Sequence, residues 1–169
     1  MPKFVPDYIF SKFDDVTPDF LASLGIKGII LDIDNTLEPY EHETPGDHVV
    51  KWFEDLKNAG IHASIVSNNN RERVDNFNKN LNLPAYSHSA KPFKKFLLKA
   101  MNDMGTNVTN TVFMGDQIFT DILAAHNAGI KGILVPPIND KKDLLTKFKR
   151  LLETPIIRKY KKENDDAGI

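Results

Sequence analysis

The sequence predicts an α/β fold built on a central, mainly parallel sheet. Short apolar runs typical of buried strands alternate along the chain with segments whose apolar residues recur at helical spacing. Such alternation favours parallel strands joined by right-handed crossover helices. In addition, several of the apolar runs end in clusters of polar residues, and ligands bind beyond the carboxyl ends of parallel strands.

The strand expected at residues 28–31 is the centre of the predicted sheet. Its apolar run is continuous, which is typical of a strand buried on both faces. The run ends in Asp32 and Asp34, and burying unpaired carboxylates is costly unless a cation lies beside them. Because hard oxygen ligands suit Mg²⁺, we expect a magnesium ion at the end of this strand.

The other elements follow from apolar runs, helical periodicity and capping residues. A lead-in of residues 1–25 carries one short helix, which Thr17 caps and Pro18 opens. A later helix is expected to open at Lys91-Pro92. Further strands are expected at residues 61–66, 83–87, 111–114 and 132–135, and helices at residues 48–59, 71–81, 91–104, 119–128 and 141–152.

The composition is that of an ordinary globular protein. The 169 residues fit a single domain, with a core at about 26–137, the lead-in, and a basic C-terminal helix and tail at 138–169. The absence of cysteine excludes disulfides, thiolate catalysis and cysteine zinc sites. The N-terminus lacks an apolar core long enough for a signal peptide, and no run approaches a membrane-spanning length. We therefore expect a cytoplasmic protein, with peripheral association to a membrane left open.

Polar clusters also end two other expected strands. Ser67 and three asparagines follow the strand at 61–66, and Gly115-Asp116 follow the strand at 111–114. Lys91 lies at a helix start between these two clusters. Because the carboxyl ends of parallel strands meet at one edge of a sheet, we expect these positions to converge on the first carboxylate pair.

This set of side chains predicts phosphoryl-transfer chemistry. Asp32 suits a nucleophile that attacks phosphorus, and Asp34 a general acid that protonates the leaving oxygen and later activates water. Mg²⁺ held by Asp32, the main-chain carbonyl of Asp34 and Asp116 would screen the repulsion between nucleophile and phosphate. Ser67 and nearby backbone N–H groups would hold phosphate oxygens, while Lys91 offers positive charge to the transition state.

In the same order, these residues resemble the four motifs of the haloacid dehalogenase-like (HAD) phosphatases: Asp32-x-Asp34-x-Thr36-Leu37, Ser67, Lys91 and Gly115-Asp116-x-x-x-x-Asp121. The pattern spans roughly residues 28–135. The resemblance implies a three-layer α/β/α Rossmann-like (HAD-like) fold and Mg²⁺ dependence. It also implies hydrolysis of a phosphate monoester through an aspartyl-phosphate intermediate.

The resemblance carries the roles given above over to Asp32, Asp34, Ser67, Lys91 and Asp116. It makes Lys91 both a catalytic and a phosphate-binding residue. Asp121 matches the second acid of the fourth motif, which implies that it contacts a metal ligand or reaches the ion through a water molecule. Thr36 is likewise expected to contact a metal ligand rather than the ion. The backbone at Asn68 is a further candidate donor to the phosphate.

Many HAD enzymes carry a cap domain, but the intervals 37–61 and 68–90 leave no room for one. A capless site resembles members that act on bulky or macromolecular phosphates, or that are closed by a partner. The sequences at 34–38, 67–69 and 115–121 look most like the bacterial YqeG-type branch (HAD subfamily IIIA). That branch is related to mitochondrial phosphatidylglycerophosphate phosphatases.

Two alternative functions stay open. The first is a membrane-surface lipid phosphatase acting on a phosphatidylglycerophosphate-like substrate. Residues 141–169 hold 9 Lys and Arg against 5 Asp and Glu, whereas residues 1–140 hold 13 against 18, so the C-terminal segment could meet an anionic membrane surface. A nucleic-acid partner is not expected. The second alternative is a catalytically silent binding or scaffold protein that keeps the HAD fold.

For two basic segments we favour a structural role over a binding role. We expect residues 141–152 to form a helix that packs on the sheet with a solvated basic face, while residues 155–162 are left undecided. Arg71 and Arg73 are expected on a solvated helix face rather than against substrate.

Overall fold

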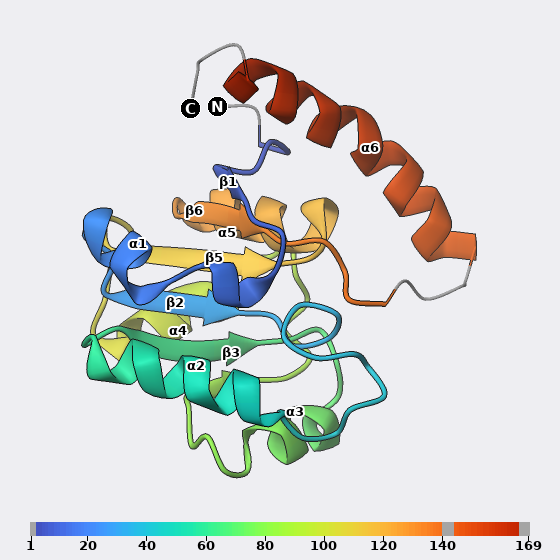
Figure 1. Cartoon of the computed structure of the whole chain (residues 1–169). Helices are drawn as coiled ribbons and strands as arrows, with labels where there is room; N and C mark the ends of the chain where they lie inside the picture. The colour runs from blue at the N-terminus through green and yellow to red at the C-terminus, as the bar shows by residue number, and fades with distance from the viewer. Residues whose placement is uncertain (1–2, 140–143, 166–169) are drawn as a thin grey trace.

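The computed structural model describes residues 3–139 and 144–165. Six strands form one sheet in the order β1-β6-β5-β2-β3-β4, and every neighbouring pair is parallel. Their carboxyl ends therefore lie at one edge, on the right in Figure 1. The strands are β1 (Tyr8–Ile9), β2 (Gly28–Leu31), β3 (His62–Val66), β4 (Ala85–Tyr86), β5 (Thr111–Gly115) and β6 (Lys131–Leu134).

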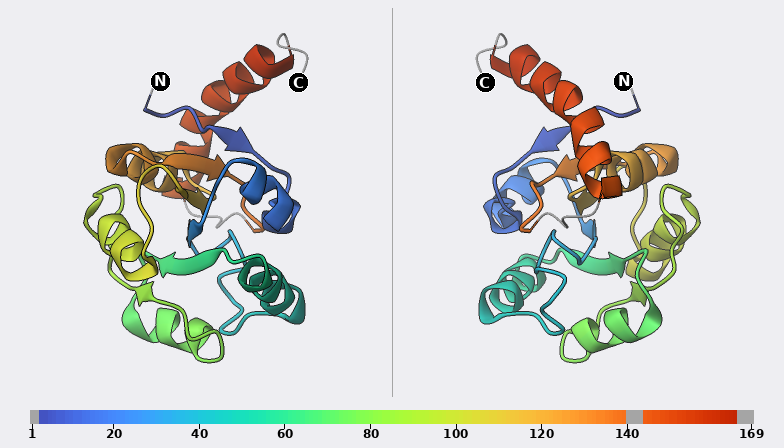
Figure 2. Two further views of the ribbon diagram at one scale, coloured as in Figure 1. Left: turned by 90° about the vertical axis from the view of Figure 1, so that its left-hand side faces the viewer. Right: turned by 90° about the vertical axis from the view of Figure 1, so that its right-hand side faces the viewer.

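Helices cover both faces of the sheet, so the predicted three-layer α/β/α fold is confirmed (Figure 2). Ile29 and Leu31 belong to a core cluster with residues of α1, α2 and α3, whereas Ile30 belongs to a second cluster with residues of α4 and α5. The central strand is thus buried on both faces. The helices are α1 (Pro18–Ser23), α2 (Asp47–Asn58), α3 (Arg71–Asn78), α4 (Lys95–Met104), α5 (Leu123–Ala128) and α6 (Leu144–Asp165), with short helices η1 (Phe13–Asp15) and η2 (Ile118–Ile122).

The lead-in contains more structure than the sequence predicted. Its expected helix is present as α1, where the Thr17 side chain accepts a hydrogen bond from the Phe20 N–H. It also contributes β1, which pairs with β6 at the edge of the sheet. A strand of two residues is too short to show the alternation by which strands are recognised in a sequence.

Two expected helices begin differently in the structure. The helix expected to open at Lys91-Pro92 begins at Lys95, so Lys91 lies in the preceding loop. Proline disfavours helical backbone at the residue before it, which keeps Lys91 itself outside the helix. The helix expected at 119–128 divides into a π-helical turn, η2, followed by α5.

The C-terminal helix is longer than predicted. Residues 141–143 lie outside the described part of the chain, but α6 continues through Pro155 to Asp165. Ile156 and Ile157 pack on a cluster that includes Leu134 of β6, which holds the second half of α6 against the sheet edge. Within residues 3–139 and 144–165, every helix is too short or too polar to cross a lipid bilayer.

Candidate active site

A pocket of about 420 Å³ lies at the carboxyl edge of the sheet. It collects the side chains that follow β2, β3 and β5, as the parallel topology predicts. Helix α6 reaches the same pocket from the far end of the chain. The lining residues are Asp32, Asp34, Asn35, Tyr40, Ser67, Asn68, Asn69, Lys91, Asp116, Gln117, Thr120, Asp121, Lys149 and Arg150.

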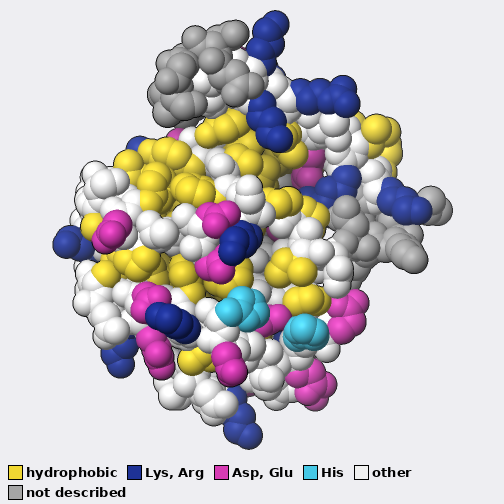
Figure 3. Space-filling model, in the orientation of Figure 1, with side chains coloured by type: hydrophobic (Ala, Val, Ile, Leu, Met, Phe, Trp, Pro, Cys, Tyr) yellow, Lys and Arg dark blue, Asp and Glu magenta, His cyan; other side chains and the backbone are white. Residues whose placement is uncertain are grey.

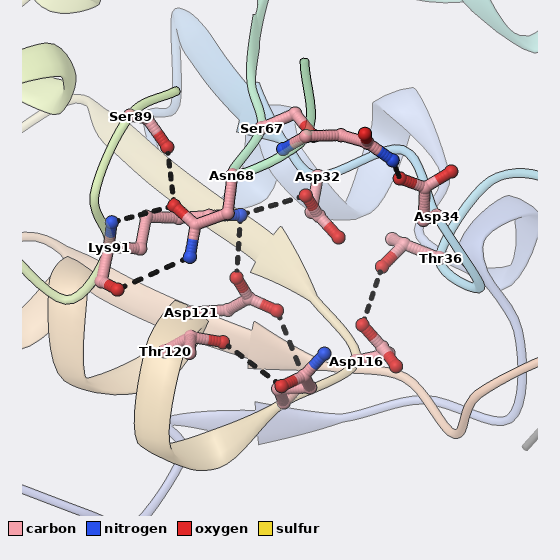
Figure 4. A network of polar contacts seen from close by, with 12 residues as sticks. Asp32, Asp34, Thr36, Ser67, Asn68, Ser89, Lys91, Asp116, Thr120 and Asp121 are labelled. Atoms are coloured by element: carbon pink, nitrogen blue, oxygen red, sulfur yellow. Dashed lines mark hydrogen bonds and ion pairs between the residues drawn. The ribbon is translucent and has the colours of Figure 1, made fainter. Parts of the chain in front are cut away.

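Lys91 links two carboxylates at the floor of the pocket (Figure 4). Its Nζ lies 2.8 Å from Asp32 Oδ1 and 2.8 Å from Asp121 Oδ1, and all three residues are buried. Burial alone would lower the pKa of Lys91, but the carboxylates of Asp121 and Asp32 outweigh it and raise that pKa above its ordinary value. Lys91 therefore stays positively charged at this position.

The acids of the pocket carry more negative charge than Lys91 balances. Burial raises the pKa of Asp32 to about 8, with Lys91 opposing the shift and the Asp121 and Asp116 carboxylates adding to it. Burial and Asp121 likewise raise the pKa of Asp116 to about 7. Such shifts measure how unfavourable the negative charges are at this place, and a bound cation would relieve them.

The donors fit a hard divalent cation. Asp32, Asp116 and Asp121 each offer a carboxylate oxygen, and these oxygens lie within 4.8 Å of one another. Carboxylate oxygens are the ligands that Mg²⁺ prefers in proteins. The sequence predicts that Asp121 acts indirectly, as a neighbour of the metal ligands, but its carboxylate is one of the three that could bind the ion. The Asp34 side chain is not one of these three.

Gly115 makes the approach of Asp121 possible. A Cβ atom at position 115 would lie 2.4 Å from the Asp121 carboxylate, a distance at which atoms collide. The Asp121 carboxylate is held in addition by the Gln117 N–H, which donates to its Oδ2 at 3.1 Å. The glycine of the fourth motif therefore serves the close packing of the second acid.

Asp34 is held by two side chains beside the pocket. Asn69 Nδ2 donates to its Oδ2 at 2.8 Å, and Arg73 Nε donates to its Oδ1 at 2.9 Å. Arg73 is buried, with 9% of its surface exposed, so its expected place on a solvated face is wrong, while Arg71 is exposed as expected. Arg73 Nη1 also donates to the main-chain oxygens of His42 and Glu43, which ties the loop after β2 to α3.

Asn68 holds the loop that presents Lys91. Its Oδ1 accepts hydrogen bonds from Ser89 Oγ at 2.9 Å and from the Lys91 N–H at 2.7 Å, and its Nδ2 donates to the Lys91 main-chain oxygen at 3.3 Å. The side chain of Asn68 thus positions Lys91, which sequence reasoning missed. Ser67 lies buried at the end of β3, and its Oγ accepts from the Asn69 N–H at 3.1 Å.

Asp116 is bound from two directions. Thr36 Oγ1 donates to its Oδ1 at 3.4 Å, so Thr36 does lie behind a candidate ligand. Arg150 Nη2 of α6 donates to its Oδ2 at 2.7 Å. Sequence reasoning missed Arg150, because it lies 34 residues from Asp116 in a segment without a motif. The apolar residues at helical spacing in this segment, Phe148, Leu151 and Leu152, are exposed, so the sequence pattern did not mark the side of the helix on which Arg150 lies.

Comparisons with known proteins agree with this geometry. The family model "Haloacid dehalogenase-like hydrolase" matches residues 19–135. The "Probable phosphatase YqeG" of Bacillus subtilis (strain 168) is 34% identical over 160 residues, which are 95% of this chain and 93% of the Bacillus protein.

Solved structures show the same fold. The cobalt-bound deoxy-D-mannose-octulosonate 8-phosphate phosphatase (YrbI) of Haemophilus influenzae has a TM-score of 0.56 at 13% identity, covering 81% of this chain and 90% of that one. The 3-deoxy-D-manno-octulosonate 8-phosphate phosphatase of Moraxella catarrhalis, in complex with magnesium, phosphate and KDO, has a TM-score of 0.51 at 18% identity, covering 68% and 72%.

The family model covers most of the parallel sheet and the residues that follow β2, β3 and β5. The Bacillus relative extends the match to nearly the whole chain. The expected hydrolase fold and family are thus confirmed by sequence and by structure. The chain belongs to the haloacid dehalogenase-like hydrolase family.

Proposed function

We propose that this hydrolase is a Mg²⁺-dependent phosphatase that cleaves a phosphate monoester through an aspartyl-phosphate on Asp32. The observation that carries the proposal is the grouping of the Asp32, Asp116 and Asp121 carboxylates in one polar pocket, with Lys91 bound to two of them. The phosphatase name of the Bacillus relative, and the magnesium and phosphate held by the Moraxella enzyme, support it.

Asp32 is the proposed nucleophile. One of its carboxylate oxygens forms a bond to phosphorus while the bond from phosphorus to the ester oxygen breaks. The leaving oxygen takes a proton from Asp34. In the second step Asp34 accepts a proton from water as the water oxygen attacks phosphorus, which releases inorganic phosphate and restores the Asp32 carboxylate.

The phosphate group needs positive charge and hydrogen-bond donors as it is transferred. Lys91 supplies the charge from the floor of the pocket, and Ser67 with the backbone N–H at Asn68 would hold phosphate oxygens. Asp32, Asp116 and Asp121 would hold Mg²⁺, together with the main-chain carbonyl of Asp34. When bound, Mg²⁺ supplies the charge that screens the anionic nucleophile from the anionic phosphate.

The intervals after β2 and β3 hold a loop with α2 and the single helix α3, so the pocket is open to solvent on that side. This favours a substrate whose phosphate projects from a bulky group. It also leaves room for a partner that covers the site.

The variant Asp32→Asn tests the proposal on a generic substrate such as p-nitrophenyl phosphate. We expect Mg²⁺-dependent turnover by the wild type and its loss in the variant, because an amide cannot attack phosphorus. Unchanged turnover in Asp32→Asn would refute the mechanism. A wild-type protein inactive on a broad panel of nucleotide, sugar, protein and lipid phosphates would favour the scaffold alternative.

A lipid phosphate at a membrane surface is the second candidate, and α6 favours it. Phe148, Leu151 and Leu152 are 58%, 69% and 45% exposed. Arg158, Lys159 and Lys162 are exposed at helical spacing from them, and Figure 3 shows hydrophobic and basic side chains together along α6. Lys149 and Arg150, between these apolar residues in sequence, line the pocket. Such a face suits an anionic bilayer.

Sedimentation with liposomes decides this candidate. We expect the protein to pellet with vesicles that contain phosphatidylglycerol and to stay in solution with pure phosphatidylcholine. The double variant Phe148→Ser, Leu151→Ser should lose the binding and keep its turnover of a small water-soluble ester. Absence of binding to either vesicle argues against a membrane substrate.

A further inference from the structure

Helix α6 places one charged side chain, Arg150, in the wall of the pocket and packs a second, Glu153, beside it, and none of the four motifs contains either residue. Arg150 lines the pocket, and Glu153 lies one turn further along the same face, 2% exposed. Nη1 of Arg150 donates to Glu153 Oε2 at 2.9 Å, so the two side chains form one unit. We call this pair the α6 clamp.

The clamp grips Asp116 at two atoms. Arg150 Nη2 donates to the carboxylate Oδ2 at 2.7 Å, and Nη1 donates to the Asp116 main-chain oxygen at 2.6 Å. A planar guanidinium that binds two atoms of one residue fixes its orientation as well as its place. The other carboxylate oxygen, Oδ1, accepts the long 3.4 Å hydrogen bond from Thr36. Arg150 therefore fixes one oxygen of Asp116 and leaves the other more weakly bound.

Glu153 holds the chain just after Asp116. Its Oε1 accepts a hydrogen bond from the Ile118 N–H at 2.9 Å, in a buried environment. Ile118 begins η2, the helical turn that carries Asp121. The clamp thus fixes both sides of the short connection from β5 to η2. One candidate metal ligand, Asp116, lies in this connection, and a second, Asp121, lies in η2.

The clamp is itself held in place by the rest of α6. Ile156 and Ile157 pack with Ile118, Ile122 and Leu134, and the Tyr160 hydroxyl donates to the Asp7 main-chain oxygen at 3.4 Å. Figures 1 and 2 show the helix running along the β1 and β6 side of the sheet, with its first turns toward the carboxyl edge. These contacts hold α6 in the position from which Lys149 and Arg150 line the pocket.

We propose that Arg150 is a positioning residue of the metal site, through which α6 keeps the Asp116 carboxylate ready to bind a divalent cation. The proposal rests on the function proposed above. Hydrogen-bonded partners of metal-ligating carboxylates act in this way, and their loss costs roughly 10- to 100-fold in metal affinity.

Removing Arg150 could also strengthen Mg²⁺ binding, so the direction of the change in affinity is informative. Arg150 is a cation beside a cation site, so a purely electrostatic view predicts that its removal strengthens Mg²⁺ binding. The positioning view predicts weaker binding, because the buried Asp116 carboxylate loses its fixed orientation. The sign of the change in the dissociation constant therefore separates the two.

The experiment titrates the full-length protein with Mg²⁺ alone by isothermal titration calorimetry. We compare the wild type with Arg150→Met and Arg150→Lys, with Lys147→Met, an exposed residue on the same helix, as the control for the charge change. We expect Arg150→Met to weaken Mg²⁺ binding by roughly 10- to 100-fold. Arg150→Lys keeps the charge but loses the planar guanidinium that binds two atoms of Asp116, and it should weaken Mg²⁺ binding less than Arg150→Met does. Lys147→Met should match the wild type.

Steady-state kinetics then distinguishes positioning from damage to the fold. For Arg150→Met, saturating Mg²⁺ should restore most of the wild-type kcat, because the ion completes the site once it is bound. Unchanged or tighter Mg²⁺ binding in Arg150→Met overturns the proposal, and so does a kcat that saturating Mg²⁺ leaves depressed. If Arg150→Met does not fold, Arg150→Lys answers the same question. A wild type that binds Mg²⁺ without turnover contradicts the proposed function alone, since the calorimetric comparison needs no substrate.

Discussion

At the scale of single residues, the pocket is organised by pairs of opposite charge. Lys91 pairs with both Asp32 and Asp121, Arg150 pairs with Asp116, and a fourth pair joins Arg73 to Asp34. Buried ion pairs add little net stability, but removing one partner leaves a buried charge uncompensated. We therefore infer that each pair serves mainly to fix the orientation of a carboxylate side chain.

The Arg73–Asp34 pair gives a test with a matched control. Arg73→Met removes the donor to Asp34 and the two hydrogen bonds to the loop at His42 and Glu43. We expect a loss of about 3 kcal/mol in the free energy of unfolding, measured in urea, because a partly buried pair is broken. We also expect kcat to fall more than KM changes, because Asp34 is the proposed general acid and base.

The control is Arg71→Met, two residues earlier on the same helix. Arg71 pairs with Asp75 at the surface, where both side chains are exposed, and such pairs contribute about 0–1 kcal/mol. The variant should therefore unfold and turn over nearly as the wild type does. Equal losses in the two variants would show that Arg73 has no special role.

The residues of the pocket differ in how far they could be predicted from the sequence. Asp32, Ser67 and Asp116 each end an apolar run, so the parallel topology alone brings them to one edge of the sheet. Arg73 and Arg150 could not be identified, because each lies on a helix among other basic residues. Which of those basic residues turns inward depends on tertiary packing.

At the scale of elements, α5 and β6 hold the N-terminal segment that leads into β1. His126 of α5 binds the segment before β1, with its Nε2 2.9 Å from Asp7 Oδ2 and its Nδ1 2.7 Å from the Lys3 main-chain oxygen. Both partners are acceptors, so both ring nitrogens are protonated when both bonds form. The Gly132 N–H of β6 also donates to Asp7 Oδ2 at 2.8 Å.

This contact predicts a pH-dependent contribution to stability. The hydrogen bond to Asp7 raises the pKa of His126 above 6.5, against the opposing effect of burial. Burial alone would raise the pKa of Asp7, but the bonds from His126 and Gly132 bring it below 3.8. The Asp7 contribution is lost as pH falls through its lowered pKa, and the His126 contribution is lost as pH rises through its raised pKa.

His126→Gln measures this contribution directly. In urea unfolding, the difference in stability between the wild type and His126→Gln should be largest between pH 3.8 and 6.5, and it should shrink above that range. The exposed His62 supplies the control His62→Gln. A difference that stays constant from pH 4 to 9, roughly the range of the titrations, would contradict the ion pair.

The elements themselves were predicted where their patterns are long. Strands β2, β3, β5 and β6 and helix α2 lie within one or two residues of their expected positions. Strand β1 is too short to carry a pattern. The sequence predicts the last helix only over residues 141–152 and leaves residues 155–162 undecided, whereas α6 runs on through Pro155 to Asp165. The helix continues because Ile156 and Ile157 pack on the core beyond the proline.

At the scale of the whole molecule, one parallel sheet explains why residues so distant in sequence share a pocket. All six strands point the same way, so every loop that leaves a carboxyl end reaches the same edge. The intervals that hold a cap in other members of the family are short here. Helix α6 instead provides a wall of the pocket, from the end of the chain.

A crystal structure with Mg²⁺ and beryllium fluoride, a mimic of the phosphoryl group on aspartate, tests this arrangement most directly. We expect beryllium on the Asp32 carboxylate, its fluorides against Ser67 and Lys91, and Mg²⁺ about 2.0–2.1 Å from oxygens of both Asp32 and Asp116. An ion bound elsewhere, or the mimic away from Asp32, would contradict the proposed site.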